Sequence, residues 1–161
     1  MKRWSHVLYA LTPLIIGYLY NFIFTKYPSL AGRLIYIVPV GLLLFWGWVG
    51  RLFAKLKYSL GYSVFAIHIF GLLSLFVSSW QYISLMLDDH QFLWFTAWSV
   101  MYFSPLTVFT ARLAAMFEPE PNVYRTLAGM WIYIIGLALY VVVFLIGFTI
   151  GKIQRKIIGQ K

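Results

Sequence analysis

The stretch "AIHIFGLLSLFVSSWQYISLMLDDH", residues 66–90, joins a long apolar run to a series of polar side chains. It belongs to an uncharged segment, residues 60–87, that stops at Asp88. A helix needs about 20 mostly apolar residues to cross a hydrocarbon core about 30 Å thick. The segment therefore predicts a membrane-spanning helix, and each polar group on it needs a partner or a purpose inside the protein.

The composition of the whole chain supports the same environment. Of its 161 residues, 62% are hydrophobic and 11% are charged, whereas a soluble domain is about half apolar and about a quarter charged. The chain has too few charged side chains to cover a surface that faces water. We therefore predict an integral membrane protein in which lipid is the main surrounding medium.

The apolar runs predict an all-α, polytopic transmembrane helix bundle that forms a single domain over residues 1–161. Short connections between the runs are typical of antiparallel neighbours in a compact bundle. Five stretches are long enough, or nearly so, to span the membrane, because uncharged runs of about 20 residues usually cross. The five predicted spans are residues 7–24, 34–50, 60–87, 92–111 and 127–151.

A four-span alternative remains open, in which residues 92–117 dip into the membrane and return, or lie flat at its surface. This segment is the least apolar of the five. With five spans the basic residues divide seven against six between the two sides. With four they divide nine against four, all four acids fall on the less basic side, and the positive-inside rule then gives a clear orientation.

The polar residues of the third predicted helix gather toward one side when they are placed at about 100° per residue. Ser74, Ser78 and Gln81 lie near the centre of this polar arc, and His68 lies within it. Small and hydroxylated residues let helices pack closely and hydrogen-bond across their interface, which is the structural interpretation. The functional interpretation is that the four residues line a path or ligand site, with His68 able to carry a proton.

Asp88 and Asp89 follow this helix and precede the next. We interpret them as a helix cap, since a carboxylate accepts hydrogen bonds from free backbone N–H groups and complements the positive end of a helix. Three consecutive residues of the sequence "DDH" cannot all point one way on a helix, and no second His or Asp cluster exists. We therefore predict neither a metal site nor a cofactor.

Glycines and tryptophans give two further expectations about packing. The motif "GFTIG", Gly147 to Gly151, is a small-xxx-small pattern that allows close helix contact, and we expect that contact inside the bundle rather than between protomers. Trp46 and Trp48 end the second predicted span. Because tryptophan favours the headgroup level, we expect both to belong to an interfacial aromatic belt.

The functional prediction is an accessory, regulatory or protective subunit that acts by helix–helix contact with a membrane partner. The chain lacks cysteine, Walker A, GxSxG and HExxH motifs, so no enzymatic activity is predicted. The alternative is a minimal, oligomeric transporter or channel whose path the polar face lines. The excess of 13 Lys and Arg over 4 Asp and Glu lies between apolar runs, which indicates anionic lipid headgroups rather than nucleic acid as partners. A bacterial inner membrane is the expected location.

Overall fold

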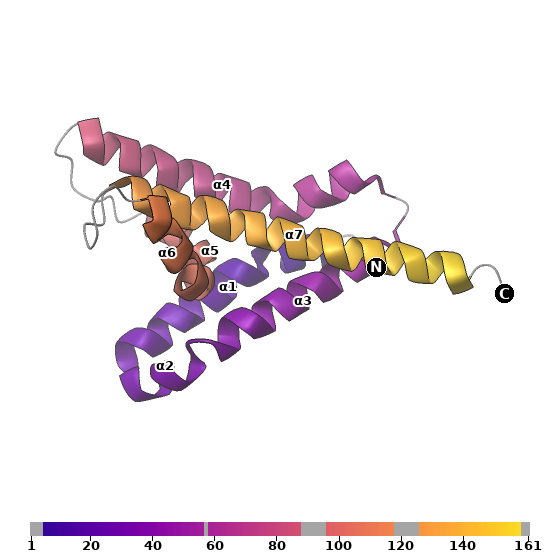
Figure 1. Ribbon diagram of the computed structural model, residues 1–161, viewed down its shortest axis with the longest axis horizontal. Coiled ribbons are helices and arrows are strands. Elements are labelled where there is room, and N and C mark those ends of the chain that lie inside the picture. The colour runs from indigo at the N-terminus through magenta and orange to yellow at the C-terminus, as the bar shows by residue number, and fades with distance from the viewer. Residues whose placement is uncertain (1–4, 57, 88–95, 118–125, 159–161) are drawn as a thin grey trace.

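The computed structural model describes residues 5–56, 58–87, 96–117 and 126–158, and within these ranges the regular structure is helical, without strands. The predicted all-α bundle is confirmed. Figure 1 shows the arrangement of its helices, which are listed here in chain order. They are α1 (Ser5–Lys26), α2 (Pro28–Leu34), α3 (Ile37–Phe53), α4 (Leu60–Leu87), α5 (Ala97–Phe103), α6 (Thr107–Ala114) and α7 (Thr126–Ile158).

The helix α4 has the bounds that the sequence predicts, and its start has a local cause. The hydroxyl of Ser59 accepts a hydrogen bond from the backbone N–H of Tyr62 at 3.3 Å, which caps the first turn. The predicted first span, 7–24, lies within α1. The predicted last span, 127–151, lies within α7, which continues through a basic, exposed turn to Ile158.

Two predicted spans differ from the structure. The second, 34–50, is shifted to α3 (Ile37–Phe53), and the preceding α2 meets it at an angle of 46°. The fourth, 92–111, becomes a helical segment over 96–117 in which a 3₁₀ turn, Ser104–Leu106, separates α5 from α6. Proline explains this break, because Pro105 has no N–H to donate to the carbonyl of Met101 four residues earlier.

By length and composition, four helices in the described ranges are able to cross a membrane, and a fifth crossing arises if the bent pair α2–α3 counts as one span. The four are His6–Lys26, Leu60–Ser84, Ala97–Phe117 and Gly129–Ile157.

The contacts between helices show the direction in which each of them runs. Tyr82 of α4 lies against Gly129 of α7, and His68 of α4 packs on Phe144 of α7, so these two helices are antiparallel. Contacts of α3 with α7 advance along both chains, from Gly47 against Gly147 to Arg51 against Gly151, so these two helices are parallel. The start of α1, the end of α3, the start of α4 and the end of α7 therefore share one end of the bundle (Figure 1).

The segment 96–117 begins and finishes at the other end of the bundle, where α4 ends and α7 begins. At its start, the Thr96 hydroxyl donates to the side-chain oxygen of Gln81, near the end of α4. At its finish, the ring of Phe117 stacks on Trp131, near the start of α7, with 4.6 Å between ring centroids. Because α4 ends where α7 begins, these contacts favour four crossings, by α1, α3, α4 and α7, over five alternating spans, although Ala97–Phe117 has the length and composition of a span.

A labelling experiment separates the two topologies, and the absence of native cysteine makes it direct. Single cysteines at Lys55 and Ile157, both exposed, should react with a membrane-impermeant maleimide from the same side in sealed vesicles. A cysteine at exposed Arg33 should react from the other side. Opposite accessibility of positions 55 and 157 would contradict the four-span arrangement and support five spans.

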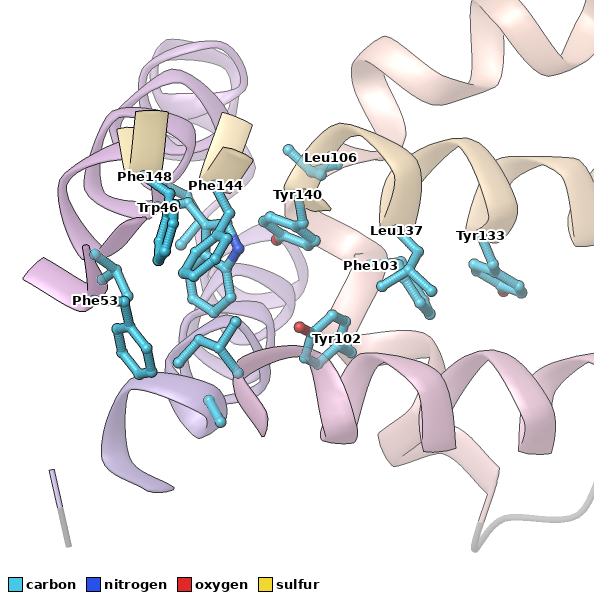
Figure 2. Close-up of a cluster of buried hydrophobic side chains, with 14 of the residues drawn as sticks. Trp46, Phe53, Tyr102, Phe103, Leu106, Tyr133, Leu137, Tyr140, Phe144 and Phe148 are labelled. Atoms are coloured by element: carbon cyan, nitrogen blue, oxygen red, sulfur yellow. The ribbon is translucent and has the colours of Figure 1, made fainter. Parts of the chain in front are cut away.

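The interior is filled mainly by aromatic side chains from α3, α5 and α7 (Figure 2). Tyr140 is central to them: its ring lies 5.3 Å from that of Trp46 and 5.6 Å from that of Tyr102, centroid to centroid. The other large buried aromatics of this core are Phe53, Phe103, Tyr133, Phe144 and Phe148. Leu, Ile, Val and Phe side chains on the outer faces of the helices remain exposed, as a surface surrounded by lipid requires.

Glycines bring α3 and α7 into backbone contact. A Cβ atom on Gly147 would lie 1.9 Å from the carbonyl oxygen of Gly47, and one on Gly50 would lie 2.2 Å from that of Phe144. Gly151 likewise faces Ala54 and the backbone of Arg51. The prediction that "GFTIG" serves contact inside the bundle is confirmed.

A third close approach accommodates the break at Pro105. The carbonyl of Met101, which Pro105 leaves without its helical donor, points at α1, where a Cβ on Gly17 would lie 1.7 Å from the oxygen. Asn21, one turn further along α1, donates to the hydroxyl of Ser104. The first helix thus covers the interruption with a glycine and a side-chain amide, so the freed backbone is buried in protein rather than lipid.

Candidate functional site: a buried polar seam along α4

The polar residues of α4 face the interior. Ser63, His68, Ser74, Ser78 and Gln81 are all buried, and we call these five side chains the α4 seam. The opposite side of the helix exposes large apolar residues, namely Phe65, Leu72, Leu73, Phe76 and Trp80. The predicted segregation of polar and apolar residues is confirmed. It keeps hydroxyl, imidazole and amide groups away from acyl chains, where an unpaired polar group costs several kcal/mol of free energy.

His68 is held by two hydrogen bonds. The indole Nε1–H of Trp46 donates to His68 Nε2 at 3.0 Å, and His68 Nδ1 lies 2.8 Å from the carbonyl oxygen of Val64. Since Nε2 accepts, the proton of the neutral ring is on Nδ1 and is donated to the carbonyl. Both ring nitrogens are thus satisfied by the protein, and the ring edge packs on Phe144.

Trp46 corrects the expectation of an aromatic belt. Its side chain is 0% exposed, whereas its near neighbour Trp48 is 47% exposed. The belt prediction is wrong for Trp46 because its indole fills the space between α3, α4 and α7. A signal was present in the sequence: Leu42, Trp46, Val49 and Phe53 recur at helical spacing and are all buried.

A second polar cluster joins the far half of α4 to α5. Ser78 donates to the hydroxyl of Ser99 at 2.8 Å, and Ser99 donates to the carbonyl oxygen of Thr96 at 2.6 Å. The hydroxyl of Thr96 in turn donates to Gln81 at 3.3 Å. The hollow that these residues line has no room for a water molecule, so it offers no water-filled passage.

Three buried hydroxyls lie in the region between the two clusters. The oxygens of Ser74, Tyr102 and Tyr140 make no hydrogen bond within the described part of the chain. The ring of Tyr102 fits against Gly71, where a Cβ atom would lie 2.9 Å from it, and Tyr140 contacts both Tyr102 and Trp46. Polar groups therefore continue along most of α4, although they form no unbroken hydrogen-bonded chain.

The prediction that the chain has no metal site can be compared with the structure only over the described residues. Across 5–56, 58–87, 96–117 and 126–158, no three His, Asp or Glu side chains lie together in a group able to hold a metal ion. Asp88 and Asp89 lie outside the described residues, so their assignment as a helix cap stays a prediction.

Comparison with known proteins returns no relative: no protein-family model, curated protein or solved structure matches this chain.

Proposed function

We propose that this multi-pass membrane protein is an accessory subunit that acts by helix–helix contact with a larger membrane protein. The observation that carries the proposal is the pairing of His68, whose two nitrogens are bonded to Trp46 and Val64. The side chain best suited to a transport path is instead used to join α3 to α4. Together with the Ser78–Ser99 hydrogen bond and the lack of room for water beside it, this favours a rigid packing unit over a conduit.

The burial of the α4 seam also says which surfaces a partner would meet. Ser74 and Ser78 face other helices of the same chain, so a partner would contact the outer apolar faces. Tyr18 on α1, Leu44 on α3 and Phe76 on α4 are strongly exposed and represent three such faces. We further propose that the end carrying Lys55 and Lys152 is cytoplasmic, in accordance with the positive-inside rule.

Site-specific photo-crosslinking in native membranes tests the accessory role. A photoreactive residue at Tyr18, Leu44 or Phe76 should give one discrete protein adduct from the face that holds the partner, and lipid adducts from the others. Products with lipid alone at all three positions would contradict the proposal.

The alternative is a small transporter or channel, and the three unbonded hydroxyls of Ser74, Tyr102 and Tyr140 favour it. They would extend a polar route between the His68 and Ser78 clusters. On this alternative His68 carries a proton or contacts the solute, consistent with an ionisable group in mid-membrane.

A flux measurement decides between the two. We expect liposomes containing the purified protein to acidify under an imposed potential no faster than empty liposomes. His68→Ala should then change nothing, as should His6→Ala, a control histidine at the start of α1. Proton flux that His68→Ala abolishes and His6→Ala leaves intact would establish the transport alternative and overturn the accessory role.

A further inference from the structure

An apolar groove opens between the first half of α4 and the middle of α7. Gly61, Val64 and Leu72 line it from α4, and Leu137, Val141 and Leu145 line it from α7. Its volume is about 390 Å³ and its walls are almost wholly apolar. His68 also lines the groove. Both of its ring nitrogens are hydrogen-bonded to Trp46 and Val64, so only ring carbon atoms are left to contact an occupant of the groove.

Gly61 contributes to the groove because it has no side chain to fill the space. Gly61 has no neighbouring atom within 4 Å of the position that a Cβ would take. Phe65 and Leu72 beside it remain largely exposed. The hollow therefore lies open to the surrounding lipid rather than inside the core.

The size of the groove restricts what can fill it. From Leu60 to Leu72 it follows α4 for 12 residues, which is about 18 Å at 1.5 Å per residue. A helix about 10 Å across would need about 1,400 Å³ over that length, about twice the 730 Å³ of empty space that the groove holds. One extended hydrocarbon chain is the occupant that matches both the length and the apolar walls.

Charge at the mouth of the groove indicates the headgroup. Lys152 and Lys156 follow Leu145 by 7 and 11 residues, so they lie on the same side of α7 and beyond its apolar part. Both are exposed. Lys152 is about 10 Å from Leu145 along the axis and about 22 Å from Leu137, which is close to the roughly 20–22 Å thickness of one leaflet with its headgroup region included. An acyl chain in the groove would place its phosphate beside the two lysines.

We propose that the groove between α4 and α7 is a binding site for one anionic glycerophospholipid, with an acyl chain against Gly61 and Leu145 and a phosphate at Lys152 and Lys156. The lysines discriminate against a second copy of this chain, whose own basic end would be repelled. They also distinguish an anionic lipid from a zwitterionic one. This site does not depend on whether the protein is an accessory subunit or a transporter.

Native mass spectrometry of the full chain in detergent tests the site, with phosphatidylglycerol and phosphatidylcholine of identical acyl chains as probes. The wild type should retain one phosphatidylglycerol in preference to phosphatidylcholine. Gly61→Phe should fill the groove and abolish this retention. Gly41→Phe is the matched control, because Gly41 is also an exposed helical glycine with no atom within 4 Å of its Cβ position, and it should retain the lipid.

A second variant tests the headgroup without altering the groove. Lys152→Gln with Lys156→Gln should weaken phosphatidylglycerol binding about 30-fold, at about 1 kcal/mol per lysine, and leave phosphatidylcholine binding unchanged. Lys26→Gln with Arg33→Gln, at the other end of the bundle, should leave phosphatidylglycerol binding unchanged. Retention by Gly61→Phe equal to the wild type, or equal binding of the two lipids by the wild type, would overturn the proposal.

Discussion

Replacing Gly147 with alanine is expected to destabilise the protein by about 3 kcal/mol, the upper end of the usual cost of overpacking. The added Cβ would lie 1.9 Å from the carbonyl oxygen of Gly47, and a backbone atom cannot turn aside as a flexible side chain can. The helices α3 and α7 would have to separate. The measurement is the free energy of unfolding in mixed micelles as the SDS fraction is raised.

Gly41→Ala provides the control on α3. A Cβ at Gly41 meets nothing within 4 Å, and alanine is favoured over glycine inside a helix by up to about 1 kcal/mol. This variant should therefore be as stable as the wild type or slightly more stable. Equal destabilisation by the two substitutions would contradict the assigned contact between α3 and α7.

Trp46→Ala is the second substitution with a large expected effect, a loss of about 3–5 kcal/mol of unfolding free energy. It removes a fully buried indole that packs on Tyr140 and His68, and it leaves His68 Nε2 without a donor. Trp48→Ala, two residues away on the exposed face, should change the stability by about 0.5 kcal/mol or less. The same SDS titration measures both.

Trp46→Phe isolates the hydrogen bond from the packing. Phenylalanine keeps most of the apolar contact but cannot donate to His68, and an unpaired buried acceptor costs about 1–3 kcal/mol. We expect a loss in that range, which His68→Phe in the same chain should partly reverse because it removes the orphaned acceptor. Equal stability of Trp46→Phe and the wild type would show that the bond between Trp46 and His68 contributes nothing.

The sequence predicts the membrane topology only in part. Nine basic residues fall on one side when residues 92–117 return to the side they came from, so charge already indicated the arrangement that the contacts favour. Apolar length pointed to five crossings instead. Length reports whether a segment is compatible with lipid, but the side on which it leaves depends on contacts such as those of Thr96 with Gln81 and of Phe117 with Trp131.

The sequence by itself determined that this is a helical membrane protein, where α4 begins and ends, and which side of α4 turns inward. These properties follow from transfer free energy and from a repeat of 3.6 residues, both of which are local. The tertiary structure alone decided that Trp46 donates its hydrogen bond to His68, since helical spacing indicates a buried face but not the partner that it meets. It also decided that α3 and α7 meet at Gly47 and Gly147, because the pairing of distant glycines depends on how the helices are arranged in space.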